Sequence, residues 1–184
     1  MKLVREKALL LIIDLQKKLV PSIFNKEEII NSTKILVETF HLLGLPIFLS
    51  EQYPKGLGET VDELQREINK TKNLKKFIKT SFSCYDLDSF KKELELSEKK
   101  QIVVAGIESH ICVLQTSFDL IAEGFEVFLV NEAIGSRKLS HKNISVQRMV
   151  SQGIILTNIE MIIYELLRSS NNDKFKELTK KFII

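Results

Sequence analysis

Three side chains in this 184-residue sequence could take part in chemistry, and each comes at or after the end of an apolar run: the carboxylate of Asp14, the ammonium of Lys79 and the thiol of Cys112. Cys112 stands where the apolar run 102–107 passes through a turn into a helical pattern. Free backbone N–H groups and the helix dipole stabilise a thiolate there, so we expect the pKa of Cys112 to fall below about 8.5, the ordinary thiol value. The same N–H groups can bind an oxyanion. A buried structural cysteine is the alternative interpretation of its position.

Asp14 and Lys79 are less informative when each is considered alone. Asp14 comes directly after the run 8–13, where a carboxylate can serve as a base or simply occupy a turn. Lys79 ends the weaker run 77–78, and a lysine in a chain with 27 Lys and Arg residues is usually a surface residue. A catalytic role for either residue requires that the fold bring it close to Cys112.

The apolar runs predict the fold that would do this. Strands of a parallel sheet that is covered on both faces read as unbroken apolar segments. Such segments are found at 8–13, 46–49, 102–107, 127–130 and 154–156. Between them, helical patterns with three- and four-residue spacing occupy 29–43, 64–68, 90–96, 111–123, 140–152 and 159–167.

This alternation predicts an α/β protein of three layers, with an open, mostly parallel, Rossmann-type sheet and helices on both faces. We expect one domain over 1–184. In the tail 169–184, the amphipathic stretch 175–184 predicts a helix that packs on this chain or on a neighbouring copy, and a disordered end is the alternative. Ligands of such sheets bind beyond the carboxyl ends of the strands, which is where Asp14, Lys79 and the residues after Ile107 fall.

Composition excludes several other classes of protein. The net charge of +3 is small and dispersed, which argues against a nucleic-acid partner, and no apolar run is long enough for a membrane span. Two cysteines make no disulfide framework, so we expect a cytoplasmic protein, with an organelle as the alternative. The three histidines, His41, His110 and His141, have no metal-ligand spacing.

Several motifs resemble those of the isochorismatase-like cysteine hydrolases, in the branch called isochorismatase domain-containing proteins. Asp14 with Gln16, and Lys79 with the Ser-Phe-Ser that follows Thr80, match two signatures, and the third is Gly-Ile-Glu-Ser-His-Ile-Cys-Val at 106–113. Further matches are the segments 51–58 and 114–116 and the pair Ser136-Arg137. The resemblance covers roughly 8–167 in the family's order.

The resemblance implies a Cys–Asp–Lys triad of Cys112, Asp14 and Lys79 that cleaves an amide through a thioester. It places the oxyanion hole at the backbone N–H groups of Glu108 and Cys112, with a cis peptide bond before Glu108. It also implies a small-molecule substrate, no cofactor and association into homo-oligomers. We add Gln16, Tyr53 and Phe82 as residues of the substrate pocket.

Two departures from family patterns narrow the activity. Relatives that deaminate nicotinamide carry an Asp-x-His zinc motif after the second strand, where this chain has Ser50-Glu51-Gln52, so we expect no metal. Isochorismatases cleave a vinyl ether without a cysteine, and Cys112 argues against that reaction. Ether hydrolysis with Cys112 in a secondary role, and a catalytically weak binding or scaffold protein, are the alternatives.

Overall fold

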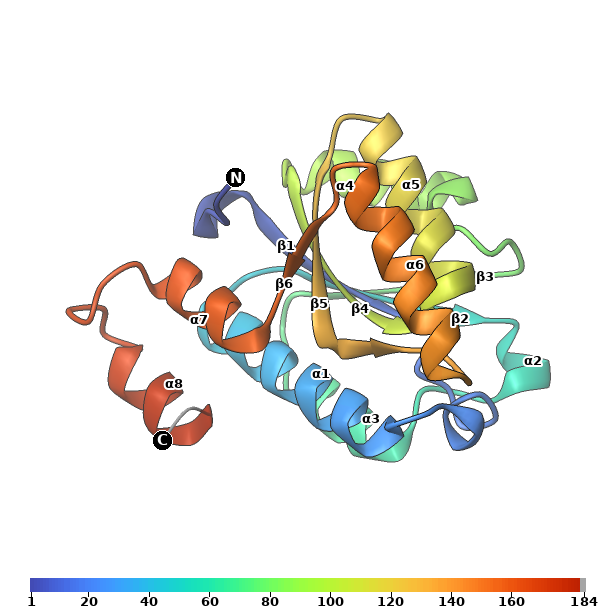
Figure 1. Cartoon of the computed structure of the whole chain (residues 1–184). Helices are drawn as coiled ribbons and strands as arrows, with labels where there is room; N and C mark the ends of the chain where they lie inside the picture. Colours follow the sequence, from blue (N-terminus) through green and yellow to red (C-terminus); the bar gives the residue numbers. More distant parts are fainter. Residues whose placement is uncertain (183–184) are drawn as a thin grey trace.

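The computed structural model describes residues 1–182. At its centre is a six-stranded sheet with the strand order β3-β2-β1-β4-β5-β6 (Figure 1). All neighbouring strands are parallel. The strands are β1 Ala8–Ile13, β2 Ile47–Gln52, β3 Leu74–Lys79, β4 Gln101–Ile107, β5 Glu126–Gly135 and β6 Ile155–Thr157. The predicted fold class is confirmed.

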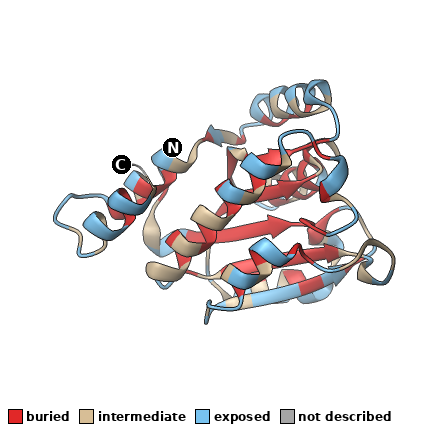
Figure 2. Cartoon of the chain, turned by 90° about the horizontal axis from the view of Figure 1, so that it is seen from below, coloured by how far each residue is buried: buried red, intermediate tan, exposed pale blue. Residues whose placement is uncertain are grey.

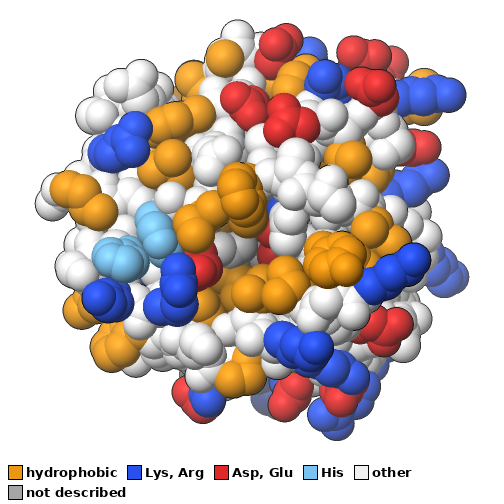
Figure 3. Space-filling model, turned by 90° about the vertical axis from the view of Figure 1, so that its right-hand side faces the viewer, with side chains coloured by type: hydrophobic (Ala, Val, Ile, Leu, Met, Phe, Trp, Pro, Cys, Tyr) orange, Lys and Arg blue, Asp and Glu red, His pale blue; other side chains and the backbone are white. Residues whose placement is uncertain are grey.

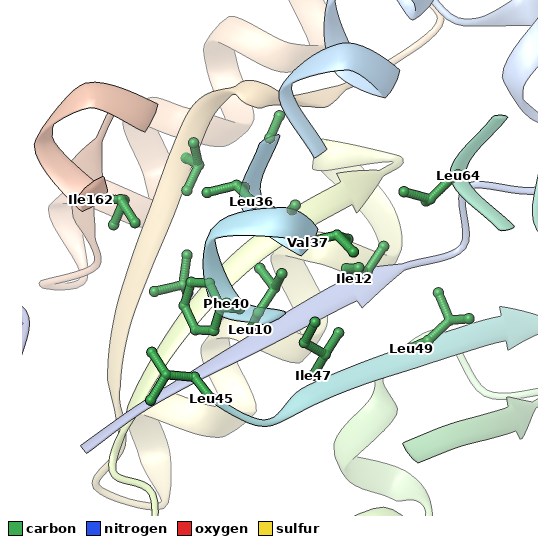
Figure 4. Close-up of a cluster of buried hydrophobic side chains, with 14 of the residues drawn as sticks. Leu10, Ile12, Leu36, Val37, Phe40, Leu45, Ile47, Leu49, Leu64 and Ile162 are labelled. Atoms are coloured by element: carbon green, nitrogen blue, oxygen red, sulfur yellow. The ribbon is translucent and has the colours of Figure 1, made fainter. Parts of the chain in front are cut away.

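Helices cover both faces of this sheet. One face carries α1 Lys26–Leu42, α3 Asp62–Ile68 and α7 Ile159–Leu167, and the other carries α4 Asp88–Leu96, α5 Leu114–Ala122 and α6 Leu139–Ser151. Successive side chains of β1 alternate between the two layers. Leu10 and Ile12 pack toward α1 (Figure 4), while Leu9 and Leu11 belong to the cluster with α4 and α5. Because both faces are covered, all six residues of β1 are buried (Figure 2).

Several strands extend further than their apolar runs suggested, β3 among them, which runs from Leu74 to Lys79 around the predicted run 77–78. β2 continues through Ser50, Glu51 and Gln52, and β5 continues to Gly135. The polar residues of β2 remain in the strand because they have partners. Glu51, for example, accepts hydrogen bonds from the backbone and hydroxyl of Thr60 and pairs with Lys76 at 2.9 Å. β3 gave a weak signal because it is an edge strand with Lys75, Lys76 and Ile78 exposed.

The helix expected at 111–123 has two parts. A π-helical turn, Ser109–Val113, carries Cys112, and α5 follows it without a break. Elsewhere the short helix α2 Pro54–Leu57 follows β2. Among residues 1–182, no helix combines the length and apolar composition needed to span a bilayer.

The tail folds back onto this chain. Its helix, α8 Phe175–Phe182, buries Leu178 in the same hydrophobic cluster as α1 and α7. Lys181 of α8 forms an ion pair with Glu38 of α1. Residues 183–184 of the expected tail helix lie outside the described part of the chain.

The close approach of β1 and β4 depends on Gly106, and this gives a test of the fold. A Cβ atom at Gly106 would lie 2.1 Å from the backbone oxygen of Ile13, and the residue has φ +124°. Gly106→Ala should therefore lower the free energy of unfolding by about 3 kcal/mol or more in a urea titration. Gly153→Ala is the control, because Gly153 also has positive φ (+89°) but has open space at its Cβ position; its cost should stay near about 1 kcal/mol. Equal costs would contradict the close-approach explanation.

Candidate active site

The sheet register brings the carboxyl ends of four strands to one edge. Ile13 of β1 is paired with Ser50 of β2 and with Gly106 of β4, and Gln52 is paired with Lys79 of β3. Asp14, directly after β1, therefore faces side chains from both neighbouring strands. This edge is the right-hand side of Figure 1 and faces the viewer in Figure 3.

Asp14 and Lys79 form a fully buried ion pair at this edge. The Nζ atom of Lys79 lies 2.6 Å from Oδ2 of Asp14, and neither side chain is exposed to solvent. The other carboxylate oxygen of Asp14 accepts a hydrogen bond from the Ser50 hydroxyl at 2.7 Å. Asp14 itself has φ +52°, so the chain turns sharply out of β1 at this residue. Both oxygens of Asp14 are thus fixed by charge-assisted hydrogen bonds.

Further acceptors surround the ammonium group of Lys79. Besides Asp14, it donates to Oε1 of Gln52 at 2.6 Å and lies 3.1 Å and 3.4 Å from the carbonyl oxygens of Phe82 and Ser81. An ammonium has three N–H bonds, and these acceptors use all of them. Burial is the largest single influence and lowers the pKa of Lys79, but the charge and hydrogen bond of Asp14, with smaller contributions from Cys84 and Cys112, together outweigh it, so the net shift is upward. Lys79 is therefore a fixed positive charge.

The thiol of Cys112 lies against Asp14, and its acidity is opposite to the expectation from the helix terminus. Burial, followed by the charge and hydrogen bond of Asp14, raises the pKa of Cys112 to about 12, although Lys79 acts in the lowering direction. The expected low pKa was wrong. A helix N-terminus stabilises a thiolate only modestly, whereas the side chain is 7% exposed and sits next to a carboxylate. At rest, Cys112 is a neutral thiol.

The turn before Cys112 has the shape that the family resemblance implied. The Ile107–Glu108 peptide bond is cis. The carbonyl of Glu108 accepts hydrogen bonds from the N–H groups of Ile111 and Val113, at 3.0 Å and 3.3 Å, so the π-helical turn wraps around it.

The three expected pocket residues differ in their surroundings. Tyr53 and Phe82 are each 53% exposed, Tyr53 directly after β2 and Phe82 three residues after Lys79. Gln16 is fully buried, and its side-chain amide binds both backbone groups of Gln52 and the carbonyl of Gly58. Gln16 thus fixes the segment after β2 in place rather than offering a free polar group to a ligand.

Two members of the site, Ser50 and Gln52, carried no separate signal in the sequence, and they hold Asp14 and Lys79. Cys84, which follows the Lys79 motif in the sequence, is a second buried thiol, and its backbone N–H donates to the hydroxyl of Thr116 at 3.0 Å. Burial raises the pKa of Cys84 to about 11. In the sequence, the segment Ser50-Glu51-Gln52 is marked only by the absence of the zinc motif and by the family match that begins at Glu51, neither of which assigns a role to Ser50 or Gln52. Alternation along β2, which directs Ser50 and Gln52 to the same side, was the available clue.

The residues that replace the zinc motif do not form a metal site. Within the described part of the chain, no three His, Cys, Asp or Glu side chains are grouped so that they could hold a metal ion. The oxygen atoms of Ser50 and Gln52 are instead engaged with the Asp14–Lys79 pair.

Comparison with known proteins agrees with this fold. The model of the Isochorismatase domain matches residues 8–161. The chain belongs to the isochorismatase-like hydrolase family. The family is the one that the motifs around Asp14, Lys79 and Cys112 resemble.

Relatives with similar sequences span most of this chain. Isochorismatase family protein 1B of Dictyostelium discoideum is 34% identical over 179 residues, which are 96% of this chain and 86% of the relative. Isochorismatase domain-containing protein 2A of Mus musculus is 33% identical over 180 residues, 97% of this chain and 84% of the relative. The solved structure of MAR1 ribonuclease from Caenorhabditis elegans superimposes with a TM-score of 0.93 and 33% identity, over 100% of this chain and 93% of that one.

The buried ion pair gives a stability prediction. Lys79→Met leaves the Asp14 carboxylate buried without its cation, which should lower the free energy of unfolding by about 3–5 kcal/mol. Adding Asp14→Asn removes the unpaired charge, so the double variant should be clearly more stable than Lys79→Met in urea titrations. Additive losses would show that the two charges do not interact.

The neutral thiol gives a second prediction, made in a Cys84→Ala background so that one cysteine remains. Cys112 should react slowly with iodoacetamide at pH 7 and faster as the pH approaches 12. Asp14→Asn removes the charge and hydrogen bond that raise the thiol pKa while Lys79 stays, so labelling at pH 7 should accelerate at least roughly 10-fold. Asp88→Asn, which removes a fully exposed carboxylate, is the control. Slower labelling in Asp14→Asn would contradict the proposed charge arrangement.

Proposed function

We propose that this protein is a metal-independent cysteine hydrolase that cleaves a small amide or a related acyl compound through a thioester. The observation that carries the proposal is the Asp14 carboxylate, fixed by Lys79 and Ser50 and placed beside the Cys112 thiol. A carboxylate in this position can accept the thiol proton as the sulfur attacks a carbonyl carbon.

The first half-reaction begins from the neutral thiol. The Cys112 sulfur forms a bond to the carbonyl carbon while its proton passes to Asp14, and the carbonyl π electrons move to oxygen. The backbone N–H groups of Glu108 and Cys112 are the proposed donors to this oxyanion. The C–N bond then breaks, Asp14 gives its proton to the departing amine, and an acyl thioester remains on Cys112.

The second half-reaction returns the enzyme to its starting state. Asp14 takes a proton from water as the water oxygen attacks the thioester carbonyl. The thiolate leaves as the tetrahedral intermediate collapses, and Asp14 returns the proton to sulfur. The products are a carboxylic acid and an amine, and one water has been consumed. Asp14 acts as base and acid in both halves, so it must lie within reach of sulfur, leaving group and water.

Lys79 has an electrostatic role in this scheme. All of its N–H bonds are used by Asp14 and the surrounding oxygens, so it donates no proton to substrate. Its charge offsets the negative charge of the site, which resides on Asp14 before the attack and on the oxyanion afterwards. A fixed charge of this kind needs no reorganisation during the reaction.

The surroundings favour a small substrate. Apolar side chains gather around a hollow at the centre of the face formed by the strand ends (Figure 3). The exposed aromatic rings of Tyr53 and Phe82 follow β2 and β3 at this end of the sheet. We propose that both rings line the pocket.

The expected cytoplasmic location and self-association stay predictions.

Ribonuclease activity is the second candidate function. It is favoured by the name of the MAR1 ribonuclease, to which this chain is similar over its full length. The small net charge of +3 favours amide hydrolysis over RNA cleavage, because proteins that bind nucleic acid through phosphate contacts generally present a basic surface. Ether hydrolysis without the cysteine and ligand binding with little turnover are the remaining candidates, and the experiment below distinguishes them.

The test is a panel of small primary amides and labelled RNA, given in parallel to the unaltered protein and to Cys112→Ala. Amide hydrolysis should be lost in Cys112→Ala by roughly 10³-fold or more, because the nucleophile is removed. Mass spectrometry of the unaltered protein should detect the acyl group on Cys112 during turnover. Cys84→Ala is the matched control and should keep most activity.

Three results would overturn this function. Hydrolysis that persists in Cys112→Ala would favour the ether-type reaction, and RNA cleavage that depends on Asp14 would favour the ribonuclease. Absence of Cys112-dependent hydrolysis across the panel would favour the binding protein.

A further inference from the structure

An arginine lies beside the proposed catalytic turn and takes no part in the mechanism above. Arg137 follows β5, and both its Nε atom and its backbone N–H donate to Oε2 of Glu108, each at 3.1 Å. Glu108 is the residue after the cis peptide bond and is four residues before Cys112. The orientation of Arg137 is therefore set by the same turn that carries the proposed nucleophile.

The ion pair fixes Arg137 but leaves much of its guanidinium available. A guanidinium has five N–H bonds, and Glu108 uses only the one on Nε. Among residues 1–182, no acceptor is hydrogen-bonded to the terminal nitrogens of Arg137. The Glu108 side chain is 10% exposed whereas that of Arg137 is 56% exposed, so the carboxylate lies inside and the guanidinium outside.

Further hydrogen-bonding groups lie close to the Arg137–Glu108 pair, and the Nδ1 atom of His110 is 4.0 Å from Oε2 of Glu108. The Nδ1 atom of His110 lies 3.0 Å from the Ser136 hydroxyl, and the ring centroid of His110 lies 4.6 Å from that of His141. Burial lowers the pKa of His110 below 6.5, so the ring is neutral at pH 7. In Figure 3, two histidines lie side by side next to a basic and an acidic side chain, at the edge of the apolar hollow.

We propose that Arg137 binds an anionic group of the substrate, so that the natural substrate is an amide bearing a carboxylate at the end remote from the scissile bond. Its free terminal N–H groups match the two oxygens of a carboxylate, which arginine binds side-on. His110 supplies a neutral hydrogen-bonding group nearby. The proposal rests on the proposed function, since it names the substrate class of that site.

The experiment uses matched pairs of primary amides that differ in one terminal group. Malonamate, succinamate and glutaramate each carry a terminal carboxylate, and propionamide, butyramide and valeramide carry a methyl group in its place. The unaltered protein should show a higher kcat/KM for one acid than for its neutral partner. The chain length with the largest preference reports the span from the scissile carbonyl to Arg137.

Substitution of Arg137 tests whether this residue causes the preference. Arg137→Gln should lower kcat/KM for the preferred acid roughly 10- to 100-fold and change that of its neutral partner less than about 3-fold, because only the acid loses a charge-assisted hydrogen bond. Turnover of the neutral amide shows that the variant is folded. Lys138→Gln is the control. It removes the neighbouring positive charge, which forms no ion pair with Glu108, and the variant should keep the preference for the acid over its neutral partner.

A binding measurement separates this inference from the proposed function. The Cys112→Ala variant cannot hydrolyse its substrate, so ligand-observed NMR should detect binding of the preferred acid to it. Adding Arg137→Gln to this variant should abolish the binding signal. Cys112-dependent hydrolysis with no preference for acids, or a preference that survives Arg137→Gln, would overturn the inference and leave the cysteine hydrolase intact. If neither acids nor neutral amides show Cys112-dependent hydrolysis, the proposed function fails, whatever the binding result.

Discussion

The ion pair between Asp14 and Lys79 is the interaction on which the site depends. Moving both charges out of water is costly, and their attraction offsets that cost only when geometry and additional hydrogen bonds are favourable. The structure supplies both: a 2.6 Å contact, Ser50 on the second carboxylate oxygen, and Gln52 with two carbonyl groups on the ammonium. These groups come from the residue after β1, from β2 and β3, and from the loop after β3, so the sheet register holds the pair together.

The buried pair also decides how Cys112 can react. Burial opposes ionisation of the sulfur most strongly, and the neighbouring carboxylate opposes a second negative charge, which together keep the thiol protonated. The same carboxylate is well placed to accept the proton once a carbonyl carbon is bonded to sulfur. In the proposed mechanism the nucleophile thus forms together with the bond to substrate. A protein of this kind would be protected from unselective alkylation and oxidation in the absence of substrate.

Much of the architecture could be predicted from the sequence, because parallel strands buried on both faces read as apolar runs. Asp14, Lys79 and Cys112 stand out as residues that follow those runs, and the motif resemblance links them. Ser50 and Gln52 were missed as partners, since their bonds join residues 36 and 27 positions apart and depend on strand register. The thiol pKa was predicted in the wrong direction because the helix terminus was considered without the burial and the Asp14 charge that outweigh it.

The central claim is that Cys112 is a neutral thiol at rest, held against the carboxyl group of Asp14. A titration of the ultraviolet absorbance of the thiolate, in the Cys84→Ala variant, tests it most directly. The account predicts no thiolate absorbance from pH 5 to 9 and a rise only as the pH approaches about 12. A thiolate already formed at pH 7 would contradict the account, because the site would then hold a preformed thiolate stabilised by Lys79.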